Sequence, residues 1–129
     1  AILAHKSIPT AEAKKAGWND ILNNTELSNT DISFGSMGLV RAHDTSLLEP
    51  LVDWYFDAVL DVWNSRTFKI AEYILENAYP IYLANEALAK KTRQFLELDE
   101  VKQKPALARI IRENLDALER ALRAQSKDN

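Results

Sequence analysis

The segment PALARIIRENLDALERALRAQ, residues 105–125, constrains the fold more than any other part of the sequence. Its apolar residues recur every three or four positions, which places them along one stripe of an α-helix: Leu107, Ile110, Ile111, Leu115, Leu118 and Leu122. Pro105 stands at the first helical position, where the N–H that proline lacks has no partner in any case. The pattern predicts a long amphipathic helix with Leu115 and Leu118 buried against other elements.

Five further helices are predicted upstream, because the apolar residues there keep a helical period and no segment alternates as a strand would. Thr30 can cap one helix with Asp31 in its first turn, Pro80 stops another, and Asn85 can cap the next. We expect helices over Thr10–Asn23, Thr30–Val40, from Ser46 to Asn64, Ser65–Tyr79 and Glu86–Leu96, followed by a charged turn at 98–104.

The third of these helices is expected to pack on more than one side. It opens with Ser46-Leu-Leu-Glu49, which has the spacing of a capping box, and Pro50 falls in the first turn, where proline is tolerated. Trp54, Phe56 and Leu60 widen its apolar stripe. The stripe itself comprises Leu48, Leu51, Val52, Tyr55, Val59 and Trp63.

The second and fifth helices carry narrower apolar faces. Gly35 and Gly38 weaken the second helix, or else let a neighbouring helix approach closely. The residues expected to point inward are Ile32, Phe34, Met37 and Leu39 in the second helix, and Leu88, Thr92, Phe95 and Leu96 in the fifth.

The fold class predicted is all-α, with about six helices. Because the links are short, consecutive helices are expected to be antiparallel and to form three pairs. Two arrangements remain open at this point: a stack of helix pairs that builds a solenoid, and a closed six-helix bundle. The wide apolar face of the third helix favours the stack, and residues 1–129 are taken as one domain.

Composition excludes several classes of protein. A net charge of −3 argues against a nucleic-acid binder, and no apolar run approaches the roughly 20 residues of a membrane span. The chain has no cysteine, which excludes disulfides and thiolate metal sites and fits a reducing compartment such as the cytoplasm. Residues 1–10 lack the features of a signal peptide. They also lack an initiator methionine, which favours a piece cut from a longer chain, although processing could also remove a methionine.

No catalytic, cofactor-binding or metal-binding residue is predicted. The two histidines, His5 and His43, are far apart, and His43 beside Asp44 is read as a solvated loop histidine. Asn23-Asn24-Thr25 matches a glycosylation acceptor only weakly. The basic cluster Lys90, Lys91 and Arg93, balanced by Glu86, Glu97, Asp99 and Glu100, is read as a solvated helix face.

The aromatic residues are read mainly as core. Some of them could instead face a peptide, but the sequence does not say which, so the substrate-binding residues are unknown at this stage. The residues in question are Trp18, Trp54, Trp63, Tyr55, Tyr73, Tyr79 and Tyr82.

Five segments, taken in order, resemble one family: Ser7–Trp18, Leu47–Trp63, Arg66–Pro80, Glu86–Leu96 and 105–125. They are similar to the C-terminal end of bacterial, actinobacterial-type aminopeptidase N, a zinc-dependent gluzincin whose last domain is shared with the endoplasmic-reticulum aminopeptidases. The resemblance implies the distal part of an α-helical, HEAT-like superhelix that closes over an upstream catalytic domain. The family's His-Glu-x-x-His and Gly-x-Met-Glu-Asn motifs are absent from this chain.

The resemblance therefore implies a non-catalytic helical domain that shapes and gates the peptide chamber of a zinc aminopeptidase. The implied partners are the upstream catalytic domain of the same chain and the peptide substrate, with no nucleic acid and no membrane. Zinc would belong to the parent enzyme and not to this segment, and a homo-oligomer remains open. The alternative is a free-standing helical-repeat module for protein interactions.

Overall fold

The computed structural model describes residues 11–23, 28–40 and 48–128, and these residues form helices and no strand. The all-α prediction is confirmed. The elements in chain order are α1 (Ala11–Asn23), α2 (Asn29–Leu39), α3 (Glu49–Ser65), α4 (Phe68–Asn77), the 3₁₀ turn η2 (Ile81–Leu83), α5 (Glu86–Leu96), α6 (Asp99–Lys102) and α7 (Pro105–Asp128).

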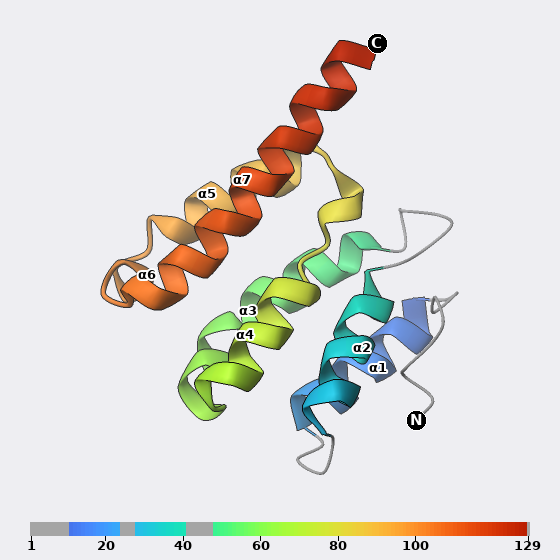
Figure 1. Ribbon diagram of the computed structural model, residues 1–129, viewed down its shortest axis with the longest axis vertical. Helices are drawn as coiled ribbons and strands as arrows, with labels where there is room; N and C mark the ends of the chain where they lie inside the picture. Colours follow the sequence, from blue (N-terminus) through green and yellow to red (C-terminus); the bar gives the residue numbers. More distant parts are fainter. Residues whose placement is uncertain (1–10, 24–27, 41–47, 129) are drawn as a thin grey trace.

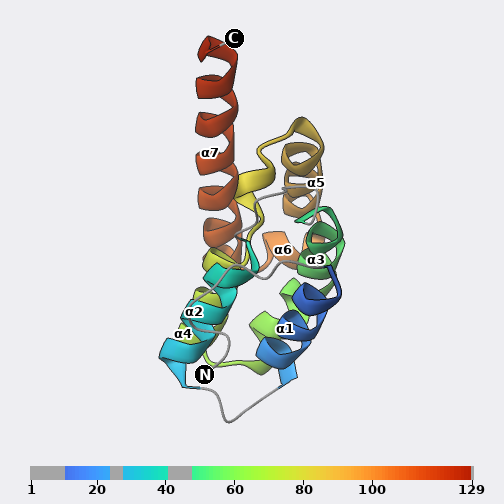
Figure 2. The same ribbon diagram turned by 90° about the vertical axis from the view of Figure 1, so that its right-hand side faces the viewer.

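Within three pairs, α1 with α2, α3 with α4 and α5 with α7, the helices lie side by side and run in opposite directions (Figure 1). α1 contacts α2, α3 contacts α4, and α5 contacts α7. The short connection between α5 and α7 contains α6. Contacts also join α1 to α3, α2 to α4, and α4 to α7. α7 is the longest helix, and its C-terminal end projects beyond the other helices (Figure 2). The HEAT-like repeat geometry stays a prediction.

Two predicted helix starts are confirmed. α7 begins at Pro105 and runs a few residues further than the predicted end at Gln125. α5 spans Glu86–Leu96, as predicted, and the side-chain oxygen of Asn85 accepts a hydrogen bond from the backbone N–H of Leu88 at 2.9 Å. This bond satisfies one of the N–H groups that the first turn of a helix leaves without a partner.

The predicted cap of α2 is wrong by two residues. Ser28, not Thr30, is the N-cap, and its hydroxyl oxygen accepts a hydrogen bond from the N–H of Asp31 at 3.0 Å. The Asp31 carboxylate accepts in return from the N–H of Ser28, which completes a capping box. Asp31 lies in the first turn, as expected, and its position three residues after Ser28 is the signal that identifies the true start.

The predicted capping box at the start of α3 does not form. α3 begins at Glu49, its N-cap is Leu48, and no side chain bonds there to the first turn. A capping box needs its acid at the third helical position, whereas Glu49 is at the first. Pro50 lies in the first turn, as expected. Ser46 lies outside the described residues.

The fourth helix begins later than predicted, and the charged turn contains a short helix. Ser65 ends α3 instead of opening α4, and Thr67 caps α4 by accepting from the N–H of Ile70 at 3.3 Å. Between them, Arg66 is extended, and its guanidinium donates to the carbonyls of Ile21 and Leu22 at 2.8 and 2.7 Å. Arg66 therefore separates α3 from α4, and its side chain closes the C-terminal end of α1.

One continuous core joins all the helix pairs. Leu107, Ile110, Ile111, Leu115 and Leu118 of α7 are buried, as predicted, and Leu122 is partly buried. The wide face of α3 is also confirmed, because Tyr55 and Phe56 are both buried and the ring of Phe56 lies 5.2 Å from that of Phe95 in α5. In α5, Leu88, Thr92 and Phe95 are buried and Leu96 is partly buried.

The small residues of α2 face its neighbours. Gly35, Ser36 and Gly38 are buried, and α2 lies against both α1 and α4. Because a glycine has no side chain, this face lets the neighbouring backbones come close. Ile32 is buried, as predicted, and Met37 is half-buried. The side chains of Phe34 and Leu39 lie outside the described part of the chain.

We predict that Leu118→Ala lowers the free energy of unfolding by about 2–5 kcal/mol, because Leu118 is fully buried and its truncation leaves a cavity. The matched control is Leu98→Ala, since Leu98 is 47% exposed and should change stability by less than about 0.5 kcal/mol. Urea denaturation followed by circular dichroism measures both. Equal effects of the two substitutions would show that α7 does not bury the predicted face.

Candidate functional site

The described residues contain no group of three or more His, Cys, Asp or Glu side chains able to hold a metal ion. His5, His43 and Asp44 lie outside the described residues, as do Asn24 and Thr25 of the glycosylation pattern, so the readings of these residues stay predictions. Within the part that the structure describes, no helix is both long and apolar enough to cross a membrane.

The aromatic residues divide into three groups by burial. Trp18, Tyr55 and Tyr79 are buried in the core, as predicted. Trp54, Trp63 and Tyr73 are partly buried against it. Tyr82 lies in the 3₁₀ turn between α4 and α5 and is 58% exposed. Its side chain is therefore accessible to another molecule.

The basic residues of α5 lie on a solvated face, as predicted, but their acidic partners come from other helices. Lys91 binds Asp53 of α3 at 2.7 Å, and Arg93 binds Glu119 of α7 at 2.9 Å. The carboxylates expected to balance them do not supply these bonds, and Glu97 instead pairs with Lys102 at 3.2 Å. Packing brings carboxylates of α3 and α7 within reach of α5, which sequence spacing does not reveal.

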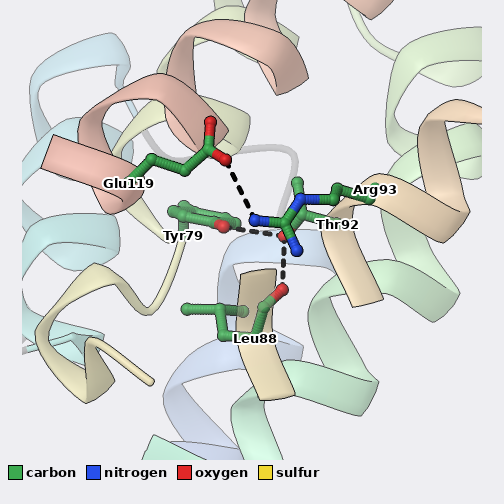
Figure 3. Close-up of polar contacts among 5 residues, drawn as sticks. All are labelled: Tyr79, Leu88, Thr92, Arg93 and Glu119. Atoms are coloured by element: carbon green, nitrogen blue, oxygen red, sulfur yellow. Dashed lines mark hydrogen bonds and ion pairs between the residues drawn. The ribbon is translucent and has the colours of Figure 1, made fainter. Parts of the chain in front are cut away.

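A groove of about 250 Å³ lies between α5 and the C-terminal part of α7. The Arg93–Glu119 ion pair crosses it (Figure 3). Arg123 is exposed on its wall and forms no ion pair within the part of the chain that the structure describes, so its guanidinium can donate hydrogen bonds to an anionic or carbonyl group. The groove is lined by Glu86, Arg93, Glu119, Leu122, Arg123 and Ser126.

Below this ion pair, a buried chain of hydrogen bonds ties the end of the α4 segment to α5 (Figure 3). Thr92 donates its hydroxyl hydrogen to the carbonyl of Leu88 at 2.7 Å, so the contact of 2.7 Å between Thr92 and Tyr79 has the Tyr79 hydroxyl as donor. Burial raises the pKa of Tyr79 to about 12. Tyr79 therefore stays a neutral donor and ties the segment after α4 to α5, next to the groove residue Arg93.

A second groove, also of about 250 Å³, lies between the start of α3 and the η2–α5 segment. Apolar and charged side chains both line it, and the charged ones include the Asp53–Lys91 ion pair. Ala84 shapes the groove because it adopts a left-handed conformation, with φ of 42°, directly after η2. The lining residues are Glu49, Val52, Asp53, Leu83, Asn85, Ala87, Leu88 and Lys91.

Two charged residues outside the grooves have shifted pKa values. Lys14 is fully buried on the same face of α1 as Trp18 and Ile21, and burial lowers its pKa. Its spacing of four and seven residues from those two could have revealed its burial. Glu76 of α4 has a raised pKa because of partial burial and because Glu72 and Glu113 lie near, against the opposing effect of Arg109 and Lys69.

Comparisons with known proteins identify the family. The family model described as ERAP1-like C-terminal domain matches residues 1–120. The chain is 31% identical over 128 residues to the aminopeptidase N of Streptomyces lividans. That alignment covers 99% of this chain but only 15% of that protein's length. The resemblance drawn from the five sequence segments is confirmed.

We predict that Glu76→Gln stabilises the protein at neutral pH and has no effect near pH 4. The folded protein binds the proton of the Glu76 carboxyl group more tightly than the unfolded chain does. The contribution of Glu76 to stability therefore falls as the pH rises from the ordinary pKa of 4.5 through the raised pKa of the folded state. The gain should be less than about 1 kcal/mol, since Glu76 is exposed and water screens its charge. Unfolding curves at several pH values measure it.

The control for this experiment is Asp57→Asn, which removes an exposed carboxylate from the middle of α3. It should not reproduce the pH-dependent gain. A gain for Glu76→Gln that is equally large at pH 4 would mean that the change acts through helix propensity and not through charge.

We predict that the purified 129-residue chain neither cleaves an aminoacyl-amide dye nor binds zinc stoichiometrically. A catalytic zinc site takes about three protein ligands, and this chain has two histidines and no cysteine. Elemental analysis after gel filtration measures the metal content. One zinc per chain at micromolar protein would contradict the prediction.

Proposed function

We propose that this chain, which belongs to the family of ERAP1-like C-terminal domains, is the distal part of the helical domain of a zinc aminopeptidase. In that role it forms part of the wall that closes over an upstream catalytic domain and shapes and gates the peptide chamber. The observation that carries the proposal is the 31% identity to one aminopeptidase N over 128 of the chain's residues. A cytoplasmic location fits the bacterial resemblance and belongs to the same proposal.

The chemistry in such a parent lies upstream. Zinc held there by two imidazoles and a carboxylate would supply a polarised water for attack on the first peptide carbonyl. The residues of this chain would confine the substrate and contact its far end. Side-chain bonds connect the helices of this wall: Arg66, directly after α3, joins α3 to α1, Lys91 joins α5 to α3, and Arg93 joins α5 to α7.

The α5–α7 groove is the candidate surface for peptide contact. It places the exposed guanidinium of Arg123 next to the apolar side chain of Leu122, and its volume of about 250 Å³ suits one or two residues of an extended peptide. The paired charges of Arg93 and Glu119 offer both donors and acceptors to a peptide backbone. Homo-oligomer formation is not needed for this role.

The second candidate function is a free-standing helical-repeat module that binds another protein. The continuous core favours it, because the described helices bury a shared interior without help from another domain. Among the residues that the structure describes, three large apolar side chains are also exposed and available to a partner: Phe68, Tyr82 and Leu98.

In the full-length aminopeptidase that carries this chain, we predict that Arg123→Ala lowers kcat/KM for peptides of about eight residues by roughly 5- to 10-fold. A tenfold change corresponds to about 1.4 kcal/mol, the scale of one lost charged contact. A one-residue amide reaches only the zinc and its neighbours, so its kcat/KM should change less than about twofold.

The matched control is Arg112→Ala, which removes an exposed arginine from the same helix outside the groove. It should leave both substrates unaffected. Equal losses on long and short substrates would indicate a structural effect alone, and no loss on either would remove the groove from the proposal.

A further inference from the structure

The inward stripe of α7 is apolar except at one position. Asn114 lies one turn beyond Ile110 and one turn before Leu118, both of which are buried, and it is itself half-buried. A polar amide in such a stripe costs stability unless its hydrogen-bonding groups find partners.

The Asn114 amide nitrogen donates to two oxygen atoms, one from each helix of the neighbouring pair. It lies 3.0 Å from the carbonyl oxygen of Leu75 in α4 and 3.3 Å from the hydroxyl oxygen of Tyr55 in α3. The Tyr55 hydroxyl in turn donates to the same Leu75 carbonyl at 2.6 Å. Three helices thus meet at one carbonyl group.

That carbonyl needs partners from outside its own helix. α4 ends at Asn77, so the residue four positions after Leu75 is beyond the helix, and the last carbonyls of a helix lack intrahelical partners. Tyr55 is completely buried, which excludes water from its hydroxyl. The side chains of Tyr55 and Asn114 therefore close the end of α4.

We propose that Asn114 is a register lock, a side chain that fixes the axial and rotational position of α7 on the α3–α4 pair. Apolar burial is not directional, and a shift of α7 by one turn would place Ile110 or Leu118 where Asn114 now lies and keep most of the apolar contact. The shifted arrangement would leave the Leu75 carbonyl without its amide donor and bury the Asn114 amide against apolar groups. Single buried polar residues select one register in the same way in coiled coils.

Other contacts at this end of the molecule do not replace the lock. The Arg93–Glu119 ion pair joins α7 to α5, not to α3 or α4, and both side chains are solvent-accessible, so the pair restrains α7 weakly. The bond between Tyr79 and Thr92 positions α5 and does not involve α7. Asn114 supplies the directional bonds to Tyr55 and Leu75.

The absence of cysteine makes a direct test possible in the isolated chain. The substitutions Asp61→Cys in α3 and Arg120→Cys in α7 place one cysteine at each of two exposed positions, and a spin label is attached to each cysteine. Pulsed electron paramagnetic resonance then measures the distribution of distances between the two labels. With Asn114 present, we expect one narrow distribution. Asn114→Leu should broaden it or add a second distance, because a one-turn shift moves α7 by about 5.4 Å.

The control is Ile110→Val, which weakens the core of the same helix but keeps the lock, and which should leave one narrow distribution. Helix content by circular dichroism verifies folding, and Asn114→Ala replaces Asn114→Leu if the latter does not fold. A narrow, unchanged distribution in the Asn114 variant would overturn the proposal. Equal broadening in the Ile110→Val control would overturn it as well, because register would then depend on core packing in general.

Discussion

The structure depends on the burial of the α7 stripe. Each leucine or isoleucine removed from water contributes on the order of 1.5–3 kcal/mol, and this helix buries five of them against α4, α5 and α6. The helices that α7 contacts also bury their own apolar faces in the same core. α7 therefore joins the last helix pair to the one before it and makes the core continuous.

Side chains from neighbouring helices then specify the arrangement that apolar burial leaves open. The guanidinium of Arg66 closes the C-terminal end of α1, and Tyr55 with Asn114 closes that of α4. Each of these bonds satisfies a carbonyl that would otherwise lack a partner, so each one ties a helix end to a position on another helix. A protein wall built this way resists deformation, which suits the proposed confinement of a peptide.

The sequence predicted the features that depend on local patterns. The period of α7, its start at Pro105 and the Asn85 cap of α5 follow from residues within one or two turns of each other. The predicted starts of α2 and α4 were wrong, because the sequence offers several neighbouring residues that could serve as the N-cap of each helix. The structure uses Ser28 for α2 and Thr67 for α4. Propensity alone does not separate such candidates.

The candidate grooves could not be predicted, because they depend on which helices lie together. Asp53 and Glu119 bind basic residues of α5 across distances of 38 and 26 positions in the chain, and no spacing rule connects them. The function came from resemblance and not from chemistry in this chain. The most direct measurement of the central claim is the coding sequence in frame upstream of Ala1. We predict a His-Glu-x-x-His motif followed by a more distant glutamate, whereas an open reading frame that begins close to Ala1 would contradict the aminopeptidase assignment.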